Sequence, residues 1–344
     1  MFLTNQRKWI SVSTINISQA QIPEGESEWV EIDVGVDSDL STVTLHLYVI
    51  NGEREGPTLW LQGGIHGNEQ GGSLAVRDLA LELDPSEISG AVIALPVSNP
   101  SGFANKRRGS QINHVGPRDV NSLFPGDPDG TFPERLADEI FSLIRSHADA
   151  VINAHSADGE TIMHTEFAYV PMSDTTTDER TSKLGSASGI THLVELDTTE
   201  MSGWMTAELV ERGIPSIIVE SGSGTHVYEW AYETYRRSIQ NVARHLDILD
   251  GKPEETDSSQ TVYSDLVFLN AGEGGFVETF VRGGDEVESG ESLAEITDLK
   301  GRQRELITSP CDGTVFAIRS FPTARPGDLV IEMAPAPTPT DDAE

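Results

Sequence analysis

Two patterns of apolar residues alternate through the first 250 residues of the chain. Short runs rich in Val, Ile and Leu end at Gly, Pro, Asn or Ser, which is typical of buried strands. Longer stretches carry apolar residues three and four positions apart, as in helices packed on a sheet. The strand-like runs are residues 42–50, 57–65, 91–97, 150–154 and 215–219, and the helix-like stretches are 69–83, 132–147, 203–212 and 228–249. This alternation predicts an α/β domain with a parallel or mixed sheet, in which ligands bind at the carboxyl ends of strands.

The helical pattern stops near residue 250. Residues 251–261 are polar and acidic, which predicts a linker between a first domain (1–250) and a second one (262–334). Within the second domain, residues 274–287 and 311–330 both begin with Gly-x-Val and end with Gly-Asp-x-Val. Two such half-repeats predict a small all-β domain, and they resemble the lipoyl/biotinyl-type fold. The tail, residues 335–344, is rich in Pro, Thr and Asp and is predicted to be disordered.

The charge of the chain restricts its partners. The 344 residues include 56 Asp and Glu but only 23 Lys and Arg, so the formal net charge is -33. Such a charge repels nucleic acids and anionic membrane surfaces, and we expect neither as a partner. Only five of the basic residues are Lys. Because the acidic surface requires screening by salt, we expect a halophilic protein.

The composition also limits the kind of metal site that the protein can form and its location in the cell. A single cysteine, Cys311, excludes an internal disulfide and a thiolate zinc cluster, so a metal site would have to use His and carboxylates. The first residues lack the apolar core of a signal peptide, and no segment has the roughly 20 consecutive apolar residues of a membrane span. We therefore expect a cytoplasmic protein.

The segment LWLQGGIHGNEQGG, residues 59–72, is the most informative in the chain. It leads from an apolar strand through a glycine-rich bend that carries His66 and Glu69 into a helix. An imidazole and a carboxylate on such a bend can converge on one zinc ion. The same His-x-x-Glu spacing occurs at His192 and at His226. We expect His192 and its glutamate to face opposite sides of a strand, and His226 and Glu229 to form an exposed pair at the start of a helix.

Two further strand ends complete the candidate site. His155 follows the run 150–154 and offers the third protein ligand of a His2Glu zinc site, which leaves room for water. Glu220 follows the run 215–219, where partial burial would raise the pKa of a carboxylate and suit it to proton transfer.

In this order, the motifs HGNE, NPSGF, DVNSLFPG, the strand-end His155 and VESG resemble the succinylglutamate desuccinylase/aspartoacylase family, a branch of the zinc carboxypeptidase superfamily. The resemblance covers about residues 40–250. It implies a zinc-carboxypeptidase-like mixed central sheet flanked by helices and one Zn²⁺ per chain, with His66, Glu69 and His155 as ligands and Glu220 as the catalytic acid/base. Members of the bacterial and archaeal type often carry a lipoyl-like β domain, as the half-repeats here indicate.

The resemblance also implies residues that bind substrate. An arginine after the Asn-Pro motif polarises the scissile carbonyl, and Arg108 matches best, with Arg107 and Arg118 as rivals. The family pattern Asp-x-Asn-Arg places an arginine on the substrate carboxylate, but here Ser122 follows Asn121. Asn121 is expected to orient the substrate, while the carboxylate clamp is lost unless another arginine replaces it. Arg118 and His114 lie in a variable loop and are candidates for substrate binding.

These observations favour a zinc amide hydrolase that removes an acyl group from an N-acylated amino acid or a related small molecule. A zinc carboxypeptidase acting on peptides is the first alternative, although it must recognise a terminal carboxylate. A non-catalytic binding or carrier protein is the second, with Lys300 as a residue for modification at a hairpin tip. The sequence leaves open whether identical subunits associate.

Overall fold

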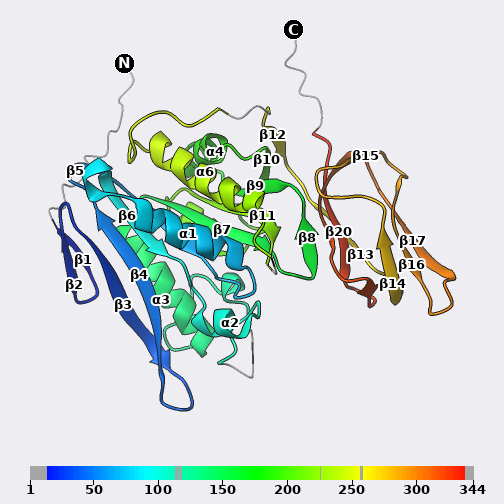
Figure 1. Cartoon of the computed structure of the whole chain (residues 1–344), viewed down its shortest axis with the longest axis horizontal. Helices are drawn as coiled ribbons and strands as arrows, with labels where there is room; N and C mark the ends of the chain where they lie inside the picture. Colours follow the sequence, from blue (N-terminus) through cyan, green and yellow to red (C-terminus); the bar gives the residue numbers. More distant parts are fainter. Residues whose placement is uncertain (1–13, 113–115, 117, 225, 256–258, 338–344) are drawn as a thin grey trace, which may run out of the picture.

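The computed structural model describes residues 14–112, 116, 118–224, 226–255 and 259–337. In this part of the chain, a mixed sheet of nine strands forms the centre of the larger unit (Figure 1). Four neighbouring strands in its middle, β11, β7, β5 and β6, run parallel, and the strands beyond them on both sides begin with an antiparallel pairing. In spatial order the sheet consists of β12 (Thr261–Tyr263), β10 (His192–Asp197), β9 (Glu166–Met172), β11 (Ser216–Ser223), β7 (Ala150–Ala157), β5 (Arg54–Gly63), β6 (Ser89–Leu95), β4 (Thr42–Asn51) and β3 (Ser27–Val36).

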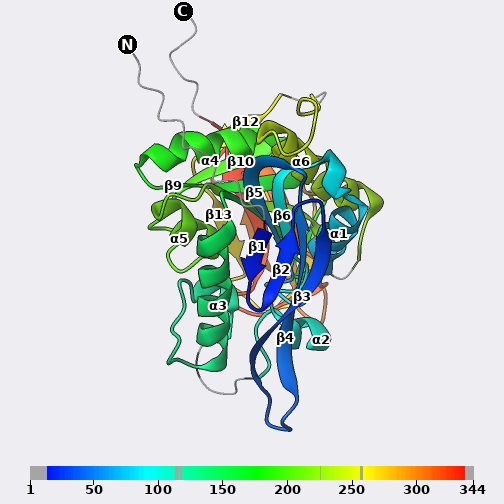
Figure 2. The ribbon, with the colours of Figure 1, turned by 90° about the vertical axis from the view of Figure 1, so that its left-hand side faces the viewer.

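Helices cover both faces of this sheet. One face is packed by α1 (Gln70–Glu82), α4 (Thr176–Ala187) and α6 (Glu229–His245). The other is packed by α3 (Phe132–His147), α5 (Met205–Glu211) and the hairpin of β1 (Thr14–Ile17) and β2 (Ala20–Pro23). Figure 2 shows α1 and α3 on opposite sides of the strands. The alternation along β5 produces these two cores, because Leu59 and Leu61 pack under α1 while Trp60 points to the other face.

The sequence pattern predicts most of the long elements, but it did not indicate β3 or α4. The helix predicted at 132–147 has the same bounds as α3, whose first turn is fixed by a capping box between Thr131 and Glu134. The helices predicted at 69–83, 203–212 and 228–249 correspond to α1, α5 and α6, each shorter than predicted. The structure adds helices that the pattern did not indicate: the 12-residue α4 and the short helices η1 (Pro85–Glu87), α2 (Pro100–Asn105) and η2 (Val120–Ser122).

The C-terminal residues from Val267 to Pro335, here called the β domain, contain strands and no helix among the described residues. One sheet holds β13 (Val267–Asn270), β20 (Leu329–Pro335), β18 (Gly313–Arg319) and β15 (Glu286–Val287). The other holds β17 (Gln303–Thr308), β16 (Ser292–Thr297), β14 (Gly275–Thr279) and β19 (Thr323–Ala324). Buried Leu293, Ile296, Val315 and Ile331 belong to its apolar core. The all-β prediction is confirmed, whereas the lipoyl/biotinyl-like type stays a prediction.

Strand pairing connects the two parts of the chain. β8 (Thr161–Met163), from the region of the large sheet, pairs antiparallel with β18 of the β domain. Thr261, in the predicted linker, begins β12, which adds to the edge of the large sheet beside β10. The predicted boundary at residue 262 falls within this strand, and the division of the chain into two domains stays a prediction. The polar linker pattern missed this strand because only three residues pair, although Tyr263 is buried.

Three further predictions concern the C-terminal tail, Lys300 and membrane-spanning segments. Strand β20 ends at Pro335, the first residue of the predicted tail, and residues 338–344 lie outside the described part. Lys300 is exposed in the turn between β16 and β17, where its backbone N–H donates to Asp298, so the predicted hairpin position is confirmed and its modification stays a prediction. Among the described helices, none combines the length and apolarity needed to cross a membrane.

Candidate active site

The bend that follows β5 carries two of the three predicted ligands. His66 lies in the bend, and Glu69 occupies the position before the first residue of α1. Gly67 allows this bend to pack closely against α2, because a Cβ at this position would lie 1.9 Å from the carbonyl carbon of Gly102. Only glycine fits such a backbone contact, so the glycine-rich sequence determines where His66 and Glu69 can lie.

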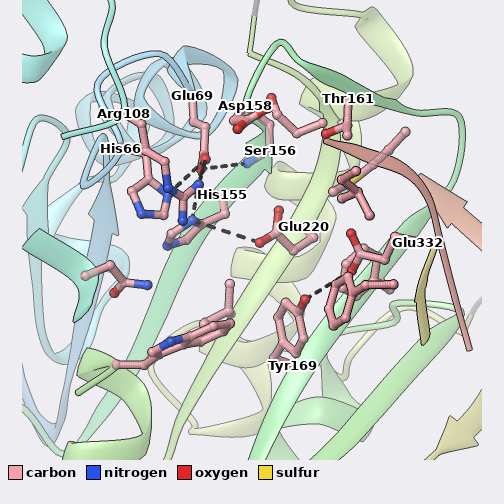
Figure 3. A pocket seen from close by; sticks show the side chains of 18 residues that line it. His66, Glu69, Arg108, His155, Ser156, Asp158, Thr161, Tyr169, Glu220 and Glu332 are labelled. Carbon is pink, nitrogen blue, oxygen red and sulfur yellow. Dashed lines mark hydrogen bonds and ion pairs between the residues drawn. The ribbon is translucent and has the colours of Figure 1, made fainter. Parts of the chain in front are cut away.

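His155 comes from β7, the strand next to β5, and meets the bend at the carboxyl edge of the sheet. His66 Nδ1 lies 2.8 Å from Glu69 Oε1, and His155 Nδ1 lies 2.9 Å from Glu69 Oε2. One ligand atom from each of the three residues lies within 4.8 Å of the others, and all three side chains are buried. The structure thus brings the three predicted ligands together in a set that could hold a metal ion (Figure 3).

The surroundings of the two imidazoles fit a metal site. His66 Nε2 is 3.0 Å from Asp119 Oδ1, so a proton on Nε2 is stabilised and the lone pair of Nδ1 is left for a metal. His155 Nε2 lies 2.9 Å from the side-chain amide of Asn153, whose Oδ1 has no hydrogen-bond partner among the described residues. When the side-chain amide of Asn153 is flipped by 180°, its Oδ1 accepts a hydrogen bond from Nε2–H of His155. The lone pair of His155 Nδ1 is then free as well. Two imidazole nitrogens and a carboxylate oxygen form a donor set that zinc accepts.

The pKa values of the two histidines shift in opposite directions. Burial disfavours the charged form of both rings. For His66, the negative charges of Glu69 and Asp119 outweigh burial and raise its pKa. For His155, burial prevails over Glu69 and lowers the pKa, which favours the neutral imidazole that metals bind.

Arg108 reaches the site from the loop after α2. Its Nε donates to Asp119 Oδ2 at 2.9 Å, and one terminal nitrogen donates to Glu69 Oε1 at 3.3 Å. The guanidinium is therefore held beside the ligand set while 46% of the side chain stays exposed. The rivals Arg107 and Arg118 are both exposed and do not line the cavity described below. His114 lies outside the described residues.

Glu220 lies on β11, directly across from His155 on β7. Its Oε1 is 3.9 Å from His155 Nδ1, and its Oε2 has no hydrogen-bond partner among the described residues. Burial raises the pKa of Glu220 well above the usual value, and the negative charges of Glu69 and Glu332 raise it further. A buried carboxylate that can hold a proton beside the ligand set is suited to acid/base work.

These residues line one cavity of about 260 Å³. Asn121, in η2, is buried in its wall, and its Oδ1 has no partner among the described residues, as suits a group that orients a ligand. Ser122, where the family pattern has arginine, is exposed. The wall also contains residues that the sequence did not indicate: Asp158, Thr161, Met163, Phe167, Tyr169, Trp204, Phe268, Leu329 and Glu332.

The other two His-x-x-Glu pairs form no such site. His192 Nδ1 lies 3.1 Å from the hydroxyl of Tyr263, and Glu195 accepts a hydrogen bond from Ser182. His226 and Glu229 are both exposed. In the described part of the chain, only His66, Glu69 and His155 form a cluster of three or more His, Cys, Asp or Glu that could hold a metal.

Comparisons with known proteins find relatives over most of the chain. The family model described as the succinylglutamate desuccinylase/aspartoacylase catalytic domain matches residues 55–246. The N-alpha-acetyl-L-2,4-diaminobutyric acid deacetylase of Halomonas elongata is 27% identical over 288 residues, which cover 81% of this chain and 82% of the deacetylase.

Solved structures share the fold over most of the chain. The succinylglutamate desuccinylase/aspartoacylase of Rhodobacter sphaeroides superposes with a TM-score of 0.82 at 26% identity, covering 91% of this chain and 96% of its own. The apo structure of the ectoine utilization protein EutE (DoeB) from Ruegeria pomeroyi gives a TM-score of 0.75 at 26% identity, covering 86% of this chain and 91% of its own. Because these alignments cover nearly the whole length, the similarity extends beyond the catalytic domain.

Proposed function

Because the chain belongs to the succinylglutamate desuccinylase/aspartoacylase family, we propose that it is a zinc-dependent amide hydrolase that removes the acyl group from an N-acylated amino acid. The observation that carries this proposal is the cluster of His66, Glu69 and His155 in one cavity with the buried Glu220. The deacetylase of Halomonas elongata supports the reaction class, since its name describes the hydrolysis of an N-acetylated amino acid.

The residues of the cavity would have different roles in the reaction. His66, Glu69 and His155 would hold zinc, which supplies Lewis acidity toward a carbonyl and lowers the pKa of water. Glu220, with its free Oε2 in the cavity, takes the proton of the attacking water and delivers it to the leaving amine. Arg108 stabilises the negative charge that develops on the carbonyl oxygen, and Asn121 orients the substrate.

The substrate is a small N-acyl amino acid, and Nα-acetyl-L-2,4-diaminobutyrate is the first compound to test. Arg108 is the only Lys or Arg among the described residues that line the cavity, and it already contacts Asp119 and Glu69. N-acetylaspartate carries a second carboxylate, which would require a further cation in the cavity. We therefore place it behind a monocarboxylate N-acyl amino acid.

The test combines metal content with turnover. Wild-type protein, His66→Ala and His226→Ala are purified in high salt, and their zinc is measured by elemental analysis while amine release is followed. His226 is a matched control, because it has the same spacing to a glutamate and is exposed. We expect about one zinc per chain and hydrolysis in wild type and His226→Ala, with both lost in His66→Ala. Wild-type protein that takes up no metal and hydrolyses no N-acyl amino acid would refute the proposal.

A further inference from the structure

The β domain forms part of the wall of the active-site cavity. Phe268 on β13 and both Leu329 and Glu332 on β20 line the same space as the ligand set. Glu332 is buried, and its Oε1 accepts a hydrogen bond of 3.2 Å from the hydroxyl of Tyr169 on β9 (Figure 3). A carboxylate from the end of the chain therefore completes the wall of a site built by the first domain.

Glu332 has no cationic partner in the described part of the chain, where its recorded partner is the neutral Tyr169. Burying a carboxylate without a counter-charge is costly. Burial, assisted by the negative charge of Asp158, raises the pKa of Glu332 to about 7 against the opposing effect of the Tyr169 hydrogen bond. A carboxylate kept in such a position requires an explanation other than stability.

The part of the cavity around Glu332 is rich in carboxyl groups. Asp158, Glu220 and Glu332 line the same space, and the negative charge of Asp158 acts on Glu332. The lining cation, Arg108, is instead held by Glu69 and Asp119. A positively charged substituent of a ligand would relieve the repulsion among these three groups.

We propose that Glu332 and the Tyr169 hydroxyl bind a protonated amine on the side chain of the amino acid being released. This inference rests on the proposed function, because it assumes that an N-acyl amino acid occupies the cavity. A carboxylate offers about four lone-pair positions, so the bond from Tyr169 leaves acceptors for an ammonium group. Glu332 is then a specificity-determining residue, and the β domain selects diamino acids over their neutral analogues.

Two substrates of matched shape test this proposal. Nα-acetyl-2,4-diaminobutyrate carries the side-chain amine, and Nα-acetyl-2-aminobutyrate has the same skeleton without it. In Glu332→Gln we expect kcat/KM for the first to fall about 10- to 100-fold, mainly through KM, as for the loss of one charge-assisted hydrogen bond. The value for the second should change less than about 3-fold. Glu332→Asp, which keeps the charge, should recover part of the loss.

The control variant is Glu278→Gln, which alters an exposed carboxylate on β14 of the same domain and should leave both substrates unaffected. Equal losses for both substrates in Glu332→Gln would assign Glu332 a structural role, and an unchanged KM for the diamino substrate would also overturn the proposal. Calorimetric binding of 2,4-diaminobutyrate to wild type and Glu332→Gln gives a readout without turnover. Weaker binding to the variant supports the amine site even if neither substrate is hydrolysed, whereas equal binding overturns it.

Discussion

At the residue scale, two acids beside the ligand set touch different groups, and we expect them to have different roles. Glu220 faces the cavity with one oxygen that has no hydrogen-bond partner among the described residues. Asp119 lies behind His66, where one oxygen meets the imidazole and the other meets Arg108. Substitution of the first should affect proton transfer, and substitution of the second should affect how firmly the metal is held.

Glu220→Gln should keep zinc and lose most turnover. Glutamine fills the same volume but cannot accept and return a proton, and such a loss costs about 10²- to 10⁴-fold in rate. Elemental analysis and kcat for the acetylated substrate measure the two effects in one preparation. Glu160→Gln, a change of an exposed acid near the cavity, serves as the control. Unaltered kcat in Glu220→Gln would remove this residue from the mechanism.

Asp119→Asn should weaken zinc binding by about 10- to 100-fold, because the carboxylate behind a metal-binding histidine orients the ring and raises its basicity. Competition with a chromophoric chelator measures the affinity directly. Asp129→Asn changes an exposed acid in the following loop and should bind zinc as wild type does. Equal affinities in the two variants would show that Asp119 does not support His66.

The residues predicted from sequence share one property, namely that His66, His155 and Glu220 each follow an apolar run that the pattern identifies as a strand. Glu332 and Tyr169 could not be found in this way. Both lie inside strands, and Glu332 reaches the cavity only because the β domain packs against the large sheet. Asn153 is likewise inside β7, and its contact with the imidazole depends on local geometry that no spacing reveals.

At the scale of elements, the bend between β5 and α1 depends on glycines with different roles. Gly67 lies against the backbone of α2, whereas a Cβ at Gly71, in the first turn of α1, would meet only the Tyr235 ring at 3.7 Å. The motif therefore contains one glycine that packing requires and one that it does not.

Gly67→Ala should lower the free energy of unfolding by more than about 2 kcal/mol, because the bend and α2 must separate to admit the methyl group. Gly71→Ala should be neutral or stabilise by up to about 1 kcal/mol, since alanine favours helix. Denaturant unfolding of both variants in the same high-salt buffer makes the comparison. Equal stability of the two variants would contradict the packing argument.

The elements that the pattern missed have physical reasons for being missed. β8 and β12 contain three residues each, too few for a period of two to appear. β9 contains Pro171, a residue that normally argues against a strand in the interior of a sheet. By contrast, β4, β5, α3 and α6 are long and periodic, and the sequence predicts them well.

At the scale of the whole molecule, the net charge of -33 sets the conditions under which the fold is stable. Like charges repel across the surface, and salt shortens the range of that repulsion. The unfolding temperature should therefore be higher in molar potassium chloride than in dilute buffer, by at least about 5 °C. Scanning calorimetry in both buffers, with sucrose as a non-ionic control, separates screening from general exclusion effects. Equal stability in both buffers would refute the halophilic prediction.

Burial of Glu332 should make stability depend on pH in a defined window. Its pKa is about 7 in the folded protein, above the value near 4.3 of an exposed glutamate, so the folded state holds a proton that the unfolded state has released. The contribution of Glu332 to the free energy of unfolding is fully present below about pH 4 and is lost as the pH rises through about 7. Besides burial, two neighbours act on the pKa of Glu332: the hydrogen bond from Tyr169 lowers it, and the negative charge of Asp158 raises it.

Glu332→Gln removes this dependence. Relative to wild type, the variant should gain stability between pH 5 and pH 7.5, by up to about 3 kcal/mol. Denaturant unfolding of wild type and Glu332→Gln across this range measures the difference. A difference that does not vary with pH would show that Glu332 keeps an ordinary pKa.

The pairing of β8 with β18 has a consequence for how proteins of this family can diverge. A recombination event that joined the first part of one member to the β domain of another would have to preserve the register in which Met163 faces Ala317. It would also replace Phe268, Leu329 and Glu332 in the cavity wall. With the role proposed here for Glu332, substrate preference would be inherited together with the β domain, and exchanging that domain between relatives would be a route by which one catalytic centre could acquire a new substrate.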